Sequence, residues 1–566
     1  NIHIILFNHI NIITRVIIIN MKKFRFRSVV QLANMKLSVK SAAIVLASST
    51  LISALLGLFR DRLLNSYYLG TYPTGIDAYT AAFTIPDFMF FILTSGALAV
   101  TFIPVFNQRL VAGNKKSAWE LSSSLLNLLA LLTLVTSILI MIFADPLIRY
   151  IVSPGLDESG MILAINMTRV IAINPFLFSI ATVLTSIQQA VGRFVFYSFA
   201  PAIYNIGIII GITWFTGGIN LFGVQIFEGG IMGVAIGVIL GAVMQLIVAL
   251  IGLFGLGFDY EFKIKWKNQG FRTILMLLPP RSLDQGIDYV NAIVNTNLSS
   301  RMGAGAVRSF NQASSLHQMP VNLIGVAIST AFFPKLTEQL GTGDDTEFYN
   351  TFRRALRTII WISLPVAAIA FFTRGYVVSF ISNIGNNDSN GTIASILGTL
   401  CVAIFARSVF HIASRGFYAY QDTRTPFRVS IIAIGLTIAF SICFYLLGWG
   451  VDGLGIAQSL GAIIEIIILL YILQRKSKHR LLDRTFWKTM LKMGFATLIT
   501  GCVAFSLTKF IPLMVTDTSL VITIPKFLLI ASASLIAYLI ASFFLNLEEA
   551  SPIFNYLKKI LFKNVK

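Results

Sequence analysis

Long apolar stretches separated by short polar connections run along most of the chain. Each stretch has about 20 residues or more, the length that an α-helix needs to cross a bilayer. Such segments must be helical, because a backbone in lipid has to satisfy its hydrogen bonds within the segment. The pattern predicts about fourteen spans, at residues 38–69, 77–106, 117–151, 160–190, 197–216, 229–257, 270–298, 304–334, 351–380, 392–420, 427–447, 452–474, 487–511 and 521–546.

Two pairs of short segments repeat at nearly one offset. Pro104 in TFIPVFNQ matches Pro334 in TAFFPKLTEQ, and Arg193 in QQAVGRF matches Arg424 in YAYQDTRTP, at offsets of 230 and 231 residues. Six spans fit into that interval, and an even number gives both halves the same orientation in the membrane. The repeat predicts two six-helix lobes, with a substrate site between them near the middle of the membrane.

We therefore expect an all-α polytopic membrane protein in which two extra C-terminal helices follow two pseudo-repeated lobes. An Ile-rich stretch that begins with Asn precedes the first span. We expect the extension at 1–36 to lie outside the fold, because initiation at Met21 or Met35 would exclude most of it. The predicted parts are this extension at 1–36, an N-lobe at 37–257, a C-lobe at 258–480, and the last two spans with a basic tail at 481–566.

Composition supports a membrane protein and excludes a soluble one. Of the residues, 56% are hydrophobic and only 12% are charged, whereas soluble domains have about 25% charged residues. The net charge of +20 lies mainly in the connections of one side, which carry about thirty Lys and Arg against a handful on the other. By the positive-inside rule both termini are cytoplasmic, and no nucleic-acid partner is needed to explain the charge.

Charged residues inside the first two predicted spans are candidates for function, because a charge in a bilayer costs several kcal/mol unless it is paired or faces water. Arg60 and Asp61 are adjacent and cannot share a helix face, so each needs its own partner or a water-filled cavity. Arg62 follows them and can snorkel outward. Asp77 opens the second span, and Asp87 follows Pro86 within it.

The seventh and eighth predicted spans contain a second set of charges. Arg281, Asp284 and Asp288 are spaced i, i+3 and i+7, and therefore lie on one helix face. Arg301 and Arg308 follow. A cavity lined with arginines suits an anion, because a guanidinium binds phosphate oxygens through two hydrogen bonds at once.

Several features of enzymes and metal proteins are missing from the sequence. It contains no P-loop, no GxSxG and no HExxH, so we expect a transporter without ATP hydrolysis or a catalytic centre. The three cysteines lie in apolar runs without ligand spacing, which argues against a disulfide framework, a metal or a cofactor. Prolines within or near the spans permit kinks and are candidate hinges: Pro86, Pro104, Pro175, Pro279, Pro280, Pro320 and Pro365.

Several motifs together resemble a known family. The stretch LLGLFRDRLLNSYYLG…DAYTAAFTIPDFMFFILTSGALAVTFIPVF at 55–106 resembles the opening of the MurJ (MviN) lipid II flippases, members of the MOP exporter superfamily. So do VSPGLDE at 152–158, FAPAIYNIG at 199–207, GVAISTAFFPKL at 325–336 and GFYAYQDTRTP at 416–426. The resemblance runs from about residue 40 to 480.

The resemblance implies a flippase that moves the lipid-linked peptidoglycan precursor lipid II from the inner to the outer leaflet by alternating access. Transport would be driven by the membrane potential or a monovalent ion, the lipid tail would lie in a groove beside the last two helices, and the chain would reside as a monomer in the bacterial plasma membrane. The family's arginine and aspartate in the first helix fall on Arg60 and Asp61, and its aspartate opening the second helix falls on Asp77.

Four positions depart from the resemblance, because arginines or a glutamate expected there are replaced by Phe90, Ser95, Ala54 and Ser315. Arg308 lies two helical turns before Ser315 and with Arg281 can replace the missing charge. We therefore predict substrate binding by Arg60, Asp61, Asp77, Arg281 and Arg308. We predict structural or gating roles for Arg62, Pro86, Asp87, Asp284, Asp288 and Ser315.

The departures leave other functions open. One is flipping of a different polyprenyl-diphosphate-linked oligosaccharide. A second is MATE-type antiport, which would be favoured by acidic residues in a cavity without arginines, the opposite of what the sequence contains. A third is a non-transporting scaffold, which has no reason to keep buried charges.

Overall fold

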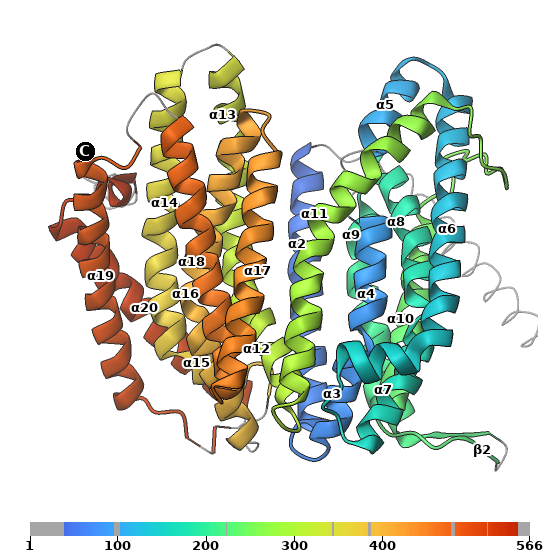
Figure 1. The fold of residues 1–566 in the computed structure, drawn as a ribbon, viewed down its shortest axis with the longest axis horizontal. Helices are drawn as coiled ribbons and strands as arrows, with labels where there is room; N and C mark the ends of the chain where they lie inside the picture. Colours follow the sequence, from blue (N-terminus) through green and yellow to red (C-terminus); the bar gives the residue numbers. More distant parts are fainter. Residues whose placement is uncertain are drawn as a thin grey trace, which may run out of the picture. The chain divides into compact units, whose positions relative to one another are not determined.

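A computed structural model describes residues 39–95, 102–221, 224–341, 345–382, 387–476, 481–514, 516–517 and 519–552. The extension predicted at 1–36 lies outside these residues. The chain is built from long helices (Figure 1). In the first half these are α2 (Val39–Tyr68), α3 (Pro73–Ala82), α4 (Thr84–Phe90), α5 (Ile103–Val111), α6 (Lys115–Pro146), α7 (Glu158–Ile171), α8 (Asn174–Ala190), α9 (Val195–Thr213) and α10 (Met232–Ile251).

The second half continues in the same way. Its helices are α11 (Gln269–Ser300), α12 (Ala306–Val321), α13 (Ala327–Gly341), α14 (Asp345–Phe372), α15 (Arg374–Ser379), α16 (Asn387–Ala419), α17 (Arg424–Leu446), α18 (Gly450–Lys476), α19 (Arg484–Phe510) and α20 (Leu520–Phe544). Short 3₁₀ turns occur at Phe215–Gly217 and Glu548–Ala550.

Thirteen helical segments of the described chain are long and apolar enough to cross a membrane. They correspond to the predicted spans except the seventh, which the structure forms as the 32-residue helix α11. This helix is long enough to span, but Arg272, Arg281, Asp284 and Asp288 lower its apolar character. The prediction of an all-α membrane protein with about fourteen spans is confirmed.

One element was not predicted. Strands β1 (Ile219–Leu221) and β2 (Val224–Phe227) form a short antiparallel hairpin in the connection between α9 and α10. It lies between two spans and does not change the fold class.

Three turns of π-helix follow prolines closely. The turns Phe91–Ser95, Leu147–Val152 and Asn322–Val326 come after Pro86, Pro146 and Pro320. A proline removes the hydrogen bond to the carbonyl four residues before it and weakens the helix locally, and the wider turns lie close to such positions here. Pro104 and Pro175 lie instead in the first turn of α5 and α8, where a missing N–H costs nothing. Only some of the predicted hinge prolines therefore interrupt a helix.

The chain divides into two compact units. Of the described residues, unit 1 contains 39–60, 82–147 and 165–286, and unit 2 contains 61–81, 148–164 and 287–552, apart from the gaps given above. In unit 1, α9 and α10 approach so closely that a Cβ on Gly207 would lie 2.2 Å from the Cα of Gly241, and one on Gly211 would lie 2.6 Å from that of Gly237. Small residues four apart allow such close helix packing in lipid.

Unit 2 has a large apolar core formed by α13, α14, α16, α18, α19 and α20. Phe348, Phe352 and Phe417 are fully buried in it. Two short segments from the first half of the sequence, 61–81 and 148–164, also belong to this unit. They carry most of the polar contacts described next.

Candidate functional site

A buried carboxylate of α3 caps the first turn of α12. Asp77 is fully buried, its Oδ2 accepts a hydrogen bond from the backbone N–H of Gly305 at 2.7 Å, and its Oδ1 accepts one from that of Arg308 at 2.8 Å. The first amides of a helix have no partner within the helix and carry its positive dipole end. Gly305 has a φ of +85°, a conformation that favours glycine. Asp77 is thus held by α12 backbone groups.

The side chain of Arg308 binds the end of α2. Its Nη2 lies 3.2 Å from Asp61 Oδ1, and its Nε donates to Asn65 Oδ1 at 2.9 Å. The guanidinium is only 5% exposed and the Asp61 carboxylate 16%. Gln312, with its amide oxygen turned toward the guanidinium, accepts a further bond from Nη1 at 2.9 Å. Arg308 is therefore neutralised by protein groups in this conformation.

Asn65 and Arg62 of α2 also bind backbone carbonyls at the end of α15. Asn65 Nδ2 donates to the carbonyl of Ile381 at 2.7 Å. Arg62 donates to the carbonyls of Ser379 and Ser382. A cation at the C-terminal end of a helix is stabilised by the free carbonyls there. Arg62 was predicted to extend toward the membrane surface, and its guanidinium binds these backbone carbonyls.

The connection between α6 and α7 binds the end of α11. Asn297 Nδ2 donates to the Ile151 carbonyl at 2.7 Å, and the N–H of Gly155 donates to Ser300 Oγ at 3.2 Å. A Cβ on Gly155 would lie 2.5 Å from the Cα of Arg301, so only glycine permits this approach. We call these contacts, together with those of Asp61, Arg62, Asn65, Asp77 and Arg308, the polar tie.

The polar tie lies at one end of unit 2. It joins residues near the first, third, seventh and ninth connections between the predicted spans, and odd-numbered connections share one side of the membrane. Its bonds are directional, partly charged and free of disulfides, so they can break and re-form. The arrangement is suited to holding helix ends together in one state and releasing them in another.

Arg60 lies in unit 1 and has a different partner from Asp61. Its Nη1 donates to Asn205 Oδ1 on α9 at 2.9 Å, and Asn205 Nδ2 donates to the Ser53 carbonyl at 3.3 Å. The two adjacent charges of α2 thus point to different surroundings, as their positions on a helix require.

Asp87 is the acidic residue within the second span. Pro86 is buried, and the helix is interrupted at Phe83 immediately before α4, as a proline three residues later favours. Among the residues whose side chains the structure describes, Asp87 has no ion-pair partner. A carboxylate in that setting points to water or to a cation within the membrane.

The remaining predicted residues are not brought into the polar tie. Arg281 and Asp284 belong to α11, but their side chains lie outside the described part of the structure. Asp288 and Ser315 are exposed on α11 and α12. Replacement of the missing positive charge by Arg281 and Arg308 therefore stays a prediction.

At two of the departing positions the structure gives a local environment. Phe90 packs edge-on against Phe91 and Phe178, with ring centroids 5.5 and 5.6 Å away. Ala54 is exposed on α2. Phe90 therefore serves apolar packing within unit 1. The side chain of Ser95 lies outside the described residues.

Sequence reasoning missed a second buried ion pair. Arg407 Nη1 on α16 lies 3.2 Å from Glu465 Oε2 on α18, whose side chain is 2% exposed, and Ser430 Oγ on α17 donates to Glu465 Oε1 at 2.7 Å. Asp288 lies within electrostatic range of Glu465. Both charges stand inside apolar spans, so the rule applied to Arg60 and Asp61 would have found them. The described residues contain no cluster of three or more His, Cys, Asp or Glu placed to hold a metal.

The chain is similar to known proteins over most of its length. A family model described as "Lipid II flippase MurJ" matches residues 65–541. The chain is 25% identical over 453 residues to "Lipid II flippase MurJ" of Burkholderia cenocepacia, covering 78% of this chain and 84% of that protein. It is 26% identical over 522 residues to "Probable lipid II flippase MurJ" of Buchnera aphidicola subsp. Schizaphis graminum, covering 91% and 97%.

Solved structures share the fold. "Lipid II flippase MurJ, inward closed conformation" superposes with a TM-score of 0.70 at 23% identity, covering 88% of this chain and 98% of that one. An inward-facing multidrug resistance MATE family transporter of the MOP superfamily gives a TM-score of 0.63 at 19% identity, covering 77% and 98%.

The apolar helical spans define a multi-pass membrane protein, and the family match makes it a transporter, as predicted, rather than an enzyme. Within that class, the match over residues 65–541 shows that the chain belongs to the lipid II flippase MurJ family. Its relatives are bacterial.

Proposed function

We propose that this chain moves lipid II from the inner to the outer leaflet by alternating access, and that the polar tie is the gate at the outer end of the path. The cap on α12 is the main support for this proposal. There the fully buried carboxylate of Asp77 accepts hydrogen bonds from two backbone amides at the start of another helix. A permanently packed structure has no need for such a contact, since burying a charge costs several kcal/mol.

The gate opens when α3 and the end of α2 separate from α12. Asp77 then loses the amides of Gly305 and Arg308, and the Arg308 guanidinium loses Asp61 and Asn65. Water and the substrate must replace these partners, because an unpaired buried charge is costly. A diphosphate is a suitable replacement for the Asp61 carboxylate, since a guanidinium can bind either through two hydrogen bonds.

Binding of the anionic head group is assigned to Arg60, Asp61, Asp77, Arg281 and Arg308. Asp61 and Asp77 act by releasing Arg308 and the N-terminus of α12, which are the groups that attract the diphosphate. Arg60, which donates to the Asn205 amide, is assigned a direct contact with the diphosphate, because a guanidinium can bind phosphate oxygens through two hydrogen bonds.

The charge bias supports a cytoplasmic position for both termini and explains the net charge without a nucleic-acid partner. The family membership supports a place in the bacterial plasma membrane, and we assign the chain a monomeric state there. Transport is coupled to the membrane potential or to a monovalent ion. The carboxylates of Asp87 and Glu465, inside the spans, are the groups that we assign to this coupling.

One experiment in cells tests the proposal. The resident flippase of a bacterial strain is depleted, this chain is expressed in its place, and lipid II exposed on the outer leaflet is measured with a reagent that cannot cross the membrane. The expected result is accessible lipid II at the level of the undepleted strain. Absence of accessible lipid II, with the chain present in the membrane at normal amount, contradicts the proposal.

A further inference from the structure

At the opposite end of unit 1 from the hairpin connection, a basic cavity of about 690 Å³ lies between α5, α6 and the connection before α11. Its lining includes four cationic side chains, Arg109, Lys116, Lys265 and Lys267, against one carboxylate, Glu120. None of these residues is used by the polar tie. The lining comes from the second and sixth connections between spans, the side that the charge bias places in the cytoplasm.

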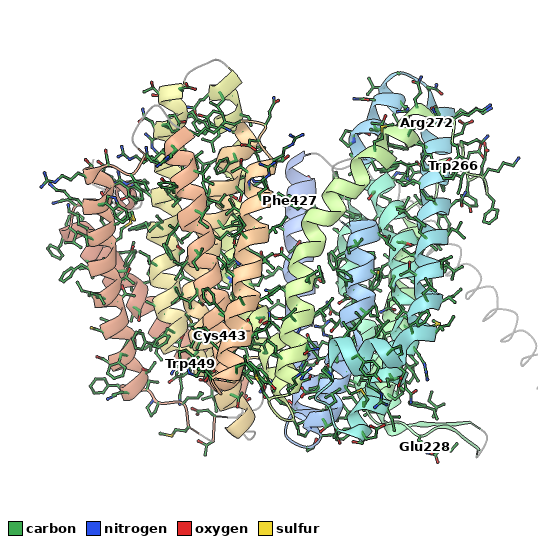
Figure 2. All side chains as sticks on the ribbon, viewed as in Figure 1. Glu228, Trp266, Arg272, Phe427, Cys443 and Trp449 are labelled. Atoms are coloured by element: carbon green, nitrogen blue, oxygen red, sulfur yellow. The ribbon has the colours of Figure 1, made fainter. Side chains whose placement is uncertain are left out.

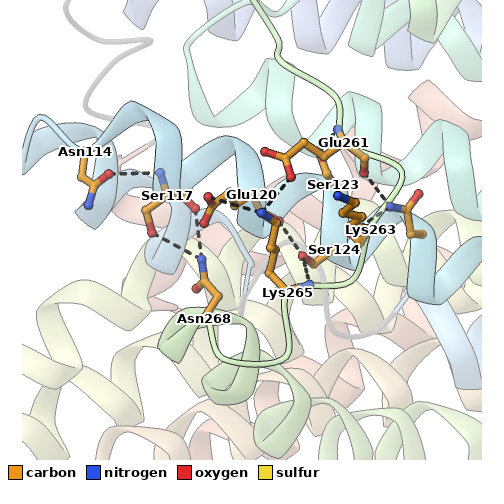
Figure 3. Close-up of polar contacts among 10 residues, drawn as sticks. Asn114, Ser117, Glu120, Ser123, Ser124, Glu261, Lys263, Lys265 and Asn268 are labelled. Atoms are coloured by element: carbon orange, nitrogen blue, oxygen red, sulfur yellow. Dashed lines mark hydrogen bonds and ion pairs between the residues drawn. The ribbon is translucent and has the colours of Figure 1, made fainter.

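The cavity has a rigid wall. Residues 258–268, which we call the strap, cross the first turns of α6 and are held there by hydrogen bonds (Figure 3). Ser123 and Ser124 accept from the backbone N–H groups of Glu261 and Lys265 at 3.2 and 2.9 Å. Asn127 Nδ2 donates to the carbonyl of Glu261 at 2.8 Å. The strap is therefore a fixed structural element.

Two helices begin at this cavity. Asn114 Oδ1 accepts from the N–H of Ser117 at the start of α6, and Asn268 Oδ1 accepts from the N–H of Gly270 at the start of α11, both at 3.0 Å. Asn268 Nδ2 also donates to Ser117 Oγ at 3.3 Å, which joins the two starts. The positive ends of both helix dipoles add to the charge of the four cations.

The cations differ in how far they are already paired. The Lys265 ammonium lies 2.9 Å from the Glu261 carboxylate and 3.8 Å from that of Glu120, and the hydrogen bond that Lys265 donates to Glu261 raises the pKa of Lys265. Arg109 donates to Ser117 Oγ and to the Val105 carbonyl, which uses two of its five N–H groups.

Two lysines of the lining remain available to a ligand. Lys116 and Lys267 are exposed, and neither has an ion-pair partner among the residues that the structure describes. Lys116 lies within electrostatic range of Glu261, but even with Glu120 and Glu261 set against the four cations the cavity keeps an excess of positive charge.

The surroundings favour a lipid over a soluble anion. The strap exposes two large aromatic side chains, Phe262 at 87% and Trp266 at 55%. Figure 2 shows Trp266 beside Arg272, whose Nε donates to the Trp266 carbonyl at 2.9 Å. Aromatic rings next to basic residues at the end of spans are typical of the head-group region of a membrane.

We propose that this cavity binds the phosphate head group of an anionic phospholipid of the cytoplasmic leaflet. Lys116 and Lys267 contact the phosphate, Arg109 and the two helix starts stabilise its charge, and Phe262 and Trp266 lie in the adjoining head-group layer. The lipid bridges α6 and the strap, which adds to the hydrogen bonds between them and so stabilises the cytoplasmic end of α11. This binding is separate from lipid II flipping and does not depend on it.

The test uses the full-length chain in detergent, titrated with phosphatidylglycerol or phosphatidylcholine and observed by native mass spectrometry. The site variant is Lys116→Gln/Lys267→Gln. The matched control is Lys115→Gln/Lys263→Gln, which removes the same charge from neighbouring positions that do not line the cavity. We expect one preferred phosphatidylglycerol, bound about tenfold more weakly or worse by the site variant and within about twofold of normal by the control.

Three results would overturn the proposal. Equal weakening by both double variants would mean that only overall charge matters. Unchanged binding by the site variant, or equal affinity for phosphatidylcholine, would mean that the cavity is not an anionic-lipid site. Displacement of the bound lipid by equimolar glycerol 3-phosphate would assign the cavity to a soluble anion instead.

Discussion

The carboxylate of Asp77 accepts a 2.8 Å hydrogen bond from the backbone N–H of Arg308, 231 residues further along the chain. The same residue, Arg308, reaches back with its side chain to Asp61 at 3.2 Å. Two aspartates of the first helices thus bind the main chain and the side chain of one arginine. Each contact helps to hold Arg308 in place for the other, so removal of either aspartate should weaken the contact that the other one makes.

Replacement of Asp77 should destabilise the tied state. In Asp77→Asn the amide keeps one acceptor but loses the charge, and hydrogen bonds to a charged group contribute about 1.5–3 kcal/mol. We expect the thermal unfolding midpoint of the purified protein to fall by several degrees. Asp157→Asn is the control, because Asp157 also accepts from a helix amide, that of Gly160, but is exposed. An equal fall of the unfolding midpoint in both variants would show that the buried carboxylate of Asp77 stabilises the protein no more than an exposed one does.

The pair of Arg308 and Asp61 should be strongly coupled. Removal of one partner leaves the other as a buried charge, which costs about 3–5 kcal/mol, whereas removal of both is much cheaper. A double-mutant cycle with Arg308→Met, Asp61→Leu and the combination measures this by thermal or denaturant unfolding. We expect the double variant to be more stable than either single variant. Additive losses would show that the two side chains act independently.

The pair of Arg407 and Glu465 separates stability from transport. Glu465→Gln should lower stability, since it leaves Arg407 without its carboxylate, and Arg407→Met/Glu465→Leu should recover most of the loss. Flipping should stay impaired in the double variant, because the coupling charge is gone. Recovery of both stability and flipping would reduce the pair to a structural role.

Acid should loosen α19 through Asp483. The hydrogen bond from Arg353 lowers the pKa of Asp483, and its Oδ1 also accepts from the Phe486 N–H at 2.7 Å as the cap of α19. A carboxyl with a lowered native pKa stabilises the fold above its unfolded pKa of about 3.9, and this stability is lost as pH falls further. The unfolding midpoint should therefore drop below about pH 4.5, and by less in Asp483→Asn. An identical pH profile in the two proteins would contradict this assignment.

Much of the fold was predictable from the sequence, because hydrophobic length and the distribution of Lys and Arg are governed by the bilayer itself. The span formed by α11 was also predicted from the apolar pattern, although its charged residues lower its apolar character. The π-helical turns and the hairpin at 219–227 were not predictable, since they depend on local packing that has no periodic signal.

The sequence predicted which charged residues belong to the site, but it did not predict which of them contact one another. Asp61, Asp77 and Arg308 were selected because charges are rare in spans. Their mutual contacts could not be predicted, because they join residues more than 220 positions apart. The roles of Asn65 and Gly155 had no sequence signal, since a neutral amide and a glycine are common in membrane helices and turns.

The central claim is that α3 must separate from the start of α12 during each transport cycle, and a reversible cross-link tests it most directly. A Cβ on Gly305 would lie 3.4 Å from that of Pro73, close to the spacing of about 3.8 Å in a disulfide. Pro73→Cys/Gly305→Cys is made in a chain whose Cys401, Cys443 and Cys502 are replaced by Ser, with each single variant as control. Lipid II flipping is measured in molecules whose cross-link is verified by mass spectrometry. The account predicts no flipping in the oxidised protein and recovery to the level of the single variants after reduction. Equal flipping by the oxidised and reduced protein would contradict it.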